Sequence, residues 1–169
     1  MHFIEREVKM LLEMYETNDP YEICSAMGIQ CFAVDMCPDL NGFCITDDGI
    51  KWICINNSLP KFKQKLICIH ELAHIIFHEN YNYKFILEHT YFSLDKYDKE
   101  VEFFVACFLI TDVSSLFQYE GLTSYEIAYN LNVPKEYVEL RFQYYKNKDC
   151  SLGFEAKLFN NPNQSILYN

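Results

Sequence analysis

One stretch of the chain is apolar at nearly every position and carries only a few strongly polar residues. It runs from Lys65 to His78 without Pro or Gly, and its interior polar residues are His70, Glu71 and His74. Such a run predicts a helix that is buried on most of its circumference. Ionisable groups left unpaired in an apolar setting destabilise a fold by several kcal/mol. We therefore expect these side chains to be paired, solvated in a cleft or bound to a metal ion.

The residues before this stretch predict two N-terminal helices. Positions 3–16 carry one broad apolar stripe, which is typical of an amphipathic helix; its members are Phe3, Val8, Leu11, Leu12 and Tyr15. Asn18-Asp19-Pro20 ends that helix and offers a cap for a second, short helix, with Pro20 in its first turn. Gly28 supplies the glycine that often follows a helix. We expect both helices to cover the core.

From Ile29 the pattern changes to short runs that are rich in β-branched, aromatic and Cys residues. The runs are Gln30 to Asp35, Gly42 to Thr46 and Lys51 to Asn56. Asp47-Asp48-Gly49 tolerates the positive φ angles of a tight turn and predicts a hairpin. We expect a small antiparallel three-stranded sheet, followed by a helix cap at Asn57 or Ser58. An edge of this sheet beside the histidine helix either docks an extended peptide by strand addition or simply packs on the helix.

Composition and charge exclude several classes of function. Half of the residues are apolar and the formal net charge is −10, which argues against general affinity for nucleic acid or for an anionic membrane surface. No apolar run approaches the roughly 18 residues of a membrane span. Charged residues interrupt positions 1–14, so we expect no signal peptide. The eight cysteines lie mostly in apolar stretches and form no CxxC pair, which predicts reduced, buried thiols of a cytoplasmic protein rather than a cysteine zinc knuckle.

The spacing of the histidines points to metal chemistry. His70 and His74 are separated by one helical turn, so their rings can converge on one ion, and Glu71 lies beside them, able to reach a metal-bound water. This is the His-Glu-x-x-His arrangement of zinc metalloproteases. The alternative is a core helix with two hydrogen-bonded histidines and a surface glutamate.

A zinc site of this kind needs a third protein ligand. His78 lies two turns from His70, about 12 Å along the axis, which is too far for both to bind one ion; we expect it at the helix C-terminus, near the dipole. The next predicted helix, residues 94–110, begins with acidic residues. Asp98 and Glu102 share a face there, so one carboxylate can bind zinc while the other receives the free ring N–H of a ligand histidine.

These two segments, Gln64 to His78 and Asp98 to Asp112, resemble the ImmA/IrrE family of zinc metallopeptidases. That family shows a helix reading HELGH and then one reading roughly ExEA(N/D)xFAAxLLxP. Asp98 falls on its metal-binding Glu and Glu102 on its Asn/Asp position, so the two carboxylates have exchanged lengths and Glu102 stays an alternative ligand. The resemblance implies that His70, His74 and Asp98 bind Zn.

The same resemblance implies a function. Glu71 would be the catalytic base of a zinc metalloendopeptidase. Its substrate would be a helix-turn-helix repressor of a phage or mobile element, a basic partner suited to an acidic surface. The competing interpretation is a metal-stabilised anti-repressor that binds its partner without cleavage.

The rest of the chain predicts a helical pair and a tail. Residues 123–141 read as two helices joined at Asn132-Val133, similar to a helix-turn-helix. From Glu120 to Lys148 four acids balance four bases, so a structural or substrate-docking role is favoured over DNA binding. In the aromatic segment before residue 98, His89, Tyr91 and Tyr97 are candidates to stabilise an oxyanion.

We therefore predict an α+β protein with one metallopeptidase-like domain over residues 1–150. It comprises the N-terminal helices (1–28), the sheet and zinc-site helices (29–112) and the helical pair (120–148), with the sheet packed on the helices. Residues 151–169 form a C-terminal extension.

Overall fold

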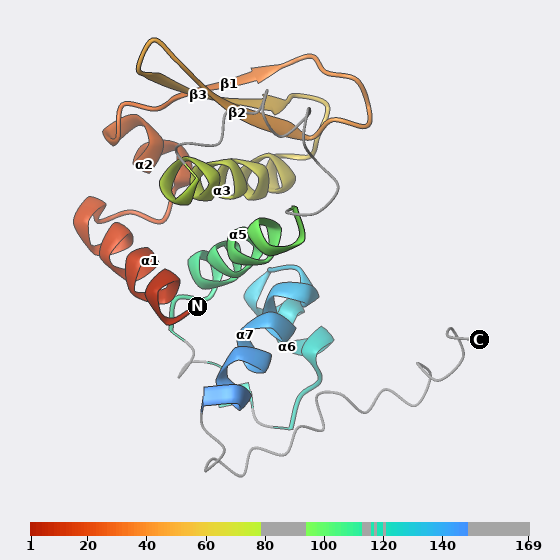
Figure 1. The fold of residues 1–169 in the computed structure, drawn as a ribbon. Coiled ribbons are helices and arrows are strands. Elements are labelled where there is room, and N and C mark those ends of the chain that lie inside the picture. Colours follow the sequence, from red (N-terminus) through yellow and green to blue (C-terminus); the bar gives the residue numbers. More distant parts are fainter. Residues whose placement is uncertain (79–93, 113–115, 117, 120, 149–169) are drawn as a thin grey trace. The chain divides into compact units, whose positions relative to one another are not determined.

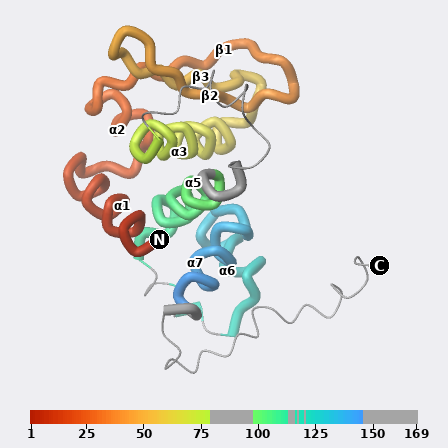
Figure 2. Tube along the Cα trace, viewed as in Figure 1, coloured from red at the N-terminus to blue at the C-terminus, as the bar shows by residue number. Residues whose placement is uncertain are grey.

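The computed structural model of the protein describes residues 1–78, 94–112, 116, 118–119 and 121–148. The chain divides into two compact units, Met1–Phe108 and a second that begins at Leu109. The elements appear in Figures 1 and 2, in the order α1 (His2–Tyr15), α2 (Pro20–Ala26), β1 (Gln30–Val34), β2 (Gly42–Asp47), β3 (Ile50–Asn56), α3 (Lys61–Phe77), α5 (Leu94–Leu109), α6 (Ser124–Leu131) and α7 (Lys135–Lys148). The predicted α+β class with a small three-stranded sheet is confirmed. The prediction of a single domain stays a prediction.

The two N-terminal helices form where the sequence predicts them. α1 buries Ile4 and Val8, whereas Phe3, a member of the predicted stripe, is exposed. The Asp19 side chain accepts a hydrogen bond from the backbone N–H of Tyr21 at 3.1 Å, which caps α2. Gly28 has a φ of 74° and turns the chain toward the sheet. The predicted cap and the predicted glycine are both confirmed.

The sheet is mixed, which corrects the prediction of an antiparallel sheet. Its strand order is β1-β3-β2: β2 and β3 form the predicted antiparallel hairpin, but β1 pairs with β3 in parallel. Parallel neighbours need a crossover of a dozen or more residues. Here residues 35–49, which include β2, provide that crossover, so β2 becomes an edge strand. Asp48 and Gly49 take the positive φ angles expected of the turn.

The sheet packs closely on α3. α3 contacts β2 and β3, and α2 packs on α3 and β1; Figure 1 shows α3 running beneath the sheet. A Cβ atom at Gly42 would lie 2.5 Å from Cγ2 of Ile67 and 2.8 Å from the carbonyl oxygen of Cys54. Only glycine fits at this point, so β2 is held directly against the helix that carries the histidines.

The start of α3 differs from the prediction. The helix begins at Lys61 after Pro60, and neither Asn57 nor Ser58 caps it. The backbone N–H and the hydroxyl of Ser58 both donate hydrogen bonds to Oδ1 of Asn56, at 3.0 Å and 2.7 Å. Gln64 reaches back from the first turn and donates to the carbonyls of Asn57 and Leu59. The predicted cap is therefore wrong, because Pro60 occupies the N-cap position and Ser58 lies two residues before it, bound to the buried Asn56.

α3 and α5 make up much of the core of the first unit. α5 is fully buried along Val101 and residues 103–107, apart from slight exposure at Cys107. The rings of Phe77 and Phe104 meet edge to face, with their centroids 5.6 Å apart. None of the helices in the described part of the chain is long and apolar enough to cross a bilayer.

The second unit contains the predicted helical pair. Thr123 and Glu126 form a capping box at the start of α6, and Asn132 ends that helix in the left-handed conformation. The pair packs around a small core of its own, which consists of Ile110, Leu116, Ile127, Ala128, Val138 and Phe142. The paired helices are confirmed. Their docking role stays a prediction, and the tail 151–169 lies outside the described residues.

Candidate metal centre

α3 presents its ionisable residues to two different neighbours. His70 faces α5, where its Nδ1 atom lies 3.1 Å from Oε1 of Glu102. Glu71 faces β2, where the thiol and the backbone N–H of Cys44 act to lower the pKa of its carboxyl group. The helix therefore lies between a carboxylate on α5 and the edge strand of the sheet, with the histidines on one side and the glutamate on the other.

The rings of His70 and His74 converge. Their Nε2 atoms lie 3.2 Å apart, and their ring centroids are 4.9 Å apart. Zinc binds imidazole nitrogen at about 2.0–2.1 Å in a tetrahedral arrangement, which separates two ligand nitrogens by about 3.3 Å. The observed spacing fits one zinc ion bound by both Nε2 atoms, so these residues satisfy the geometric test for the predicted ligand pair.

The protonation of the two rings also suits metal binding. Burial lowers the pKa of His74 to about 4, assisted by the positive charges that His70 and His78 can carry. Because zinc binds the neutral imidazole, His74 is already in the binding form at neutral pH. Burial also acts to lower the pKa of His70, but the hydrogen bond to Glu102 and the charges of Glu71 and Glu102 raise it above its ordinary value. His70 therefore keeps its proton to a higher pH than His74 does.

Glu102 occupies the position of an orienting partner for His70. Its carboxylate contacts Nδ1, the ring nitrogen that does not face His74. Histidines that bind metals commonly donate this second N–H to a carboxylate, which fixes the ring and raises its basicity. The sequence leaves open which of Asp98 and Glu102 binds zinc and which accepts the ring N–H. This contact suits Glu102 to the role of acceptor.

His78 makes the matching contact with His74. It follows the last residue of α3, as predicted, and its backbone N–H donates to the carbonyl of His74 at 2.9 Å. Its ring is buried, with Nδ1 3.1 Å from Nδ1 of His74 and Nε2 3.7 Å from Oε2 of Glu100. Each ring of the converging pair thus has a partner on the nitrogen opposite the point of convergence.

Glu71 lies in a buried environment. It is 9% exposed, and burial raises its pKa, against the lowering effects of His70 and of the hydrogen bonds from Cys44. A carboxyl group with a raised pKa takes up and gives back a proton near neutral pH more readily than an ordinary one. The environment therefore suits proton transfer.

The structure brings some predicted site residues together and leaves others apart. His70, Glu71 and His74 lie side by side. The Asp98 side chain is exposed, and its charge contributes to the raised pKa of His70. Among the described residues, no carboxylate oxygen lies within 4.8 Å of the nitrogens of both histidines at once. The role of Asp98 as third ligand stays a prediction. His89, Tyr91 and the Tyr97 side chain lie outside the part of the structure that is described.

Two contacts of the site were missed by sequence reasoning. The spacing from His74 to His78 is the same four residues as that from His70 to His74, and this could have indicated the contact between their rings. The contact of Glu71 with Cys44 joins a helix to a strand, and no local signal in the sequence indicates it.

Comparison with known proteins gives one family and two relatives. Residues 24–149 match the model of the peptidase M78 family, described as an IrrE N-terminal-like domain. The chain is 33% identical over 139 residues to "Uncharacterized immunity region protein 2" of Bacillus phage phi105, covering 82% of this chain and 88% of that protein. It is 25% identical over 134 residues to "Metallopeptidase ImmA" of Bacillus subtilis (strain 168), covering 78% and 79%. The family match includes α3 and α5.

Proposed function

This chain belongs to the peptidase M78 family of IrrE N-terminal-like domains, and we propose that it is a zinc-dependent endopeptidase. The observation that carries the proposal is the convergence of the His70 and His74 Nε2 atoms at 3.2 Å, beside the buried Glu71. A hydrogen bond between the two rings gives the same distance, so the proposal also rests on the match to the peptidase M78 family.

We assign zinc to His70 and His74, with Asp98 as third ligand. The contact of Glu102 with Nδ1 of His70 supports this division, because Glu102 then receives the ring N–H and Asp98, four residues earlier on the same face of α5, is left for the ion. When bound, zinc would act as a Lewis acid and lower the pKa of a water molecule toward about 7. Glu102 and His78 would keep the two rings in the orientation that presents Nε2.

Glu71 would move the proton. It takes a proton from the attacking water and passes it to the amine that leaves when the peptide bond breaks. The Cys44 thiol and backbone N–H lie beside this carboxylate, so β2 as well as α3 contributes to its surroundings. Its raised pKa favours the protonated form that delivers a proton to the leaving group.

The edge strand β2 gives the substrate a place to bind. An edge strand can pair with an extended peptide through backbone hydrogen bonds. Because Cys44 of β2 contacts Glu71, a peptide laid along this strand passes beside the catalytic carboxylate. We propose a helix-turn-helix repressor of a phage or mobile element as the substrate, in line with the immunity-region name of the phage relative. The net charge of −10 suits a basic partner.

The alternative function is that of an anti-repressor, which binds a repressor without cutting it. The Glu71→Gln substitution separates the two, because it removes the proton acceptor while keeping the shape and hydrogen-bonding capacity of the side chain. The assay incubates the zinc-loaded chain with the repressor of the same element and identifies new peptide termini by mass spectrometry. We expect Glu71→Gln to bind zinc and repressor but to produce no cleavage. Relief of repression that persists in this variant would identify a non-catalytic anti-repressor.

A further inference from the structure

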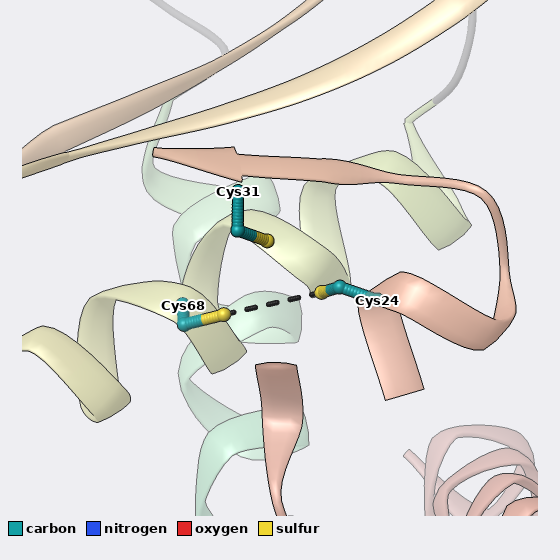
Figure 3. Close-up of side chains that lie close together, drawn as sticks. All are labelled: Cys24, Cys31 and Cys68. Atoms are coloured by element: carbon teal, nitrogen blue, oxygen red, sulfur yellow. Dashed lines mark hydrogen bonds between the residues drawn. The ribbon is translucent and has the colours of Figure 1, made fainter. Parts of the chain in front are cut away.

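Three cysteines from distant parts of the chain meet in the first unit. Cys24 lies on α2, Cys31 on β1 and Cys68 on α3, and their Sγ atoms all lie within 4.8 Å of one another. Figure 3 shows the three sulfur atoms directed into the same space between these elements. The first two are separated by seven positions and the third by a further 37, so no spacing motif in the sequence indicates the cluster.

The distances suit a bound ion. The sulfur atoms of Cys24 and Cys68 are 3.9 Å apart. Metal–thiolate bonds of about 2.3 Å separate two sulfurs by about 4.0 Å in a planar three-coordinate site and by about 3.8 Å in a tetrahedral one. This pair is therefore already at the spacing that a shared ion requires, and the other two sulfur–sulfur distances, which are at most 4.8 Å, differ from that spacing by no more than about 1 Å.

The burial of the cluster gives an ion a protected site with one open side. Cys24 and Cys68 are fully buried, whereas Cys31 is partly exposed. Because Cys31 is the one of the three that is not fully buried, we expect an ion to approach the cluster from its side. Cys31 lies on β1, at the opposite edge of the sheet from β2, which contacts Glu71.

The ligand set defines the class of ion. Soft thiolate ligands select Cu(I) and Zn²⁺ over the hard cations that prefer oxygen. Among the residues that the structure describes, no fourth His, Cys, Asp or Glu joins the three sulfurs. The set therefore suits an ion that accepts three protein ligands, either alone or with a water molecule on the open side.

We propose that Cys24, Cys31 and Cys68 form a second metal site, separate from the histidines, which binds one thiophilic d10 cation. Such an ion would tie α2 and β1 to α3 at Cys68, two residues before His70. It would therefore stabilise the first unit and hold the helix that carries the catalytic centre.

The test uses the full chain with His70→Ala and His74→Ala, so that the histidine centre does not compete. Cd²⁺ is added to the reduced protein without oxygen, and its thiolate charge-transfer absorption is recorded against added ion. Cys31→Ser is compared with Cys37→Ser, which alters an exposed cysteine outside the cluster. Zn²⁺ and Cu(I) are then added as competitors, to show which of the two displaces Cd²⁺.

We expect one Cd²⁺ per chain, loss of the absorption band in Cys31→Ser, and no change in Cys37→Ser. We also expect the bound ion to raise the melting temperature of the protein with His70→Ala and His74→Ala, but not that of the same protein with Cys31→Ser added. A parent protein without the band, or a Cys31→Ser protein that binds as the parent does, would overturn the proposal.

Alkylation supplies a measurement that does not depend on how well Cys31→Ser folds. In the parent protein, Cd²⁺ should protect Cys31 from iodoacetamide while Cys37 continues to react. Equal reactivity of Cys31 with and without the ion would also overturn the proposal.

Discussion

Removal of the His78 ring tests how the histidine pair is held. The Nδ1 atom of His78 lies 3.1 Å from Nδ1 of His74, and the ring is 8% exposed. When His74 binds zinc through Nε2, its Nδ1 carries a proton and needs an acceptor. In His78→Ala that buried N–H loses its acceptor, which costs about 1–3 kcal/mol. Loss of an outer partner of a metal-bound histidine typically lowers metal affinity by about 10–100-fold, which is the same range of free energy.

The matched control is His78→Asn. The Asn side-chain oxygen can occupy nearly the same place as Nδ1 of His78 and accept the same hydrogen bond. We expect His78→Asn to bind zinc within a few-fold of the parent and His78→Ala to bind about 10–100-fold more weakly.

The assay is a competition titration of zinc against a chelator, in the Cys31→Ser background so that the three-cysteine cluster is incomplete. Thermal unfolding without metal shows whether either variant has lost the fold. Equal zinc affinity in His78→Ala and the parent, with both proteins folded, would refute the reasoning. So would equal losses in the Ala and Asn variants.

Three further predictions follow from the same contacts. In Glu71→Gln at about pH 6, zinc binding should release about one proton. His74 has a pKa of about 4 and is neutral, whereas the hydrogen bond to Glu102, which this variant keeps, raises the pKa of His70 and leaves it protonated. Calorimetry in two buffers measures this release, and release of two protons would contradict the prediction. Glu102→Gln should lower the pKa of His70 in metal-free protein, measured by NMR titration, because it removes a negative charge 3.1 Å from Nδ1; an unchanged pKa would contradict it. Gly42→Ala should destabilise the fold by about 1–3 kcal/mol in urea unfolding, because the new Cβ would lie 2.5 Å from a methyl carbon of α3; a stability equal to the parent's would contradict it.

Features that depend on neighbours along one helix or one turn could be predicted from the sequence. Residues four apart on a helix share a face, so the convergence of His70 and His74 follows from their spacing alone. The turn at Asp48-Gly49 follows from backbone sterics in the same way. Both predictions are confirmed, because neither depends on how distant segments pack.

Features that depend on tertiary contacts could not be predicted in this way. The parallel pairing of β1 with β3 arises because the crossover places β3, and not β2, in the middle of the sheet. The predicted α3 cap was wrong because Pro60 occupies the N-cap position, and Ser58 instead binds Asn56, a buried strand residue. The three-cysteine cluster is assembled from two helices and a strand, so it becomes visible only in the folded chain.

The metal content of the purified protein tests the central claim most directly. The chain is purified without a metal-affinity step, in the Cys31→Ser background, and zinc is measured per chain by mass spectrometry. We predict about one zinc per chain, loss of zinc in His74→Ala and in Asp98→Ala, and weakened but detectable binding in Glu102→Ala. A His74→Ala protein that keeps its zinc would contradict the account, and loss of zinc in Glu102→Ala but not in Asp98→Ala would reverse the roles of the two carboxylates.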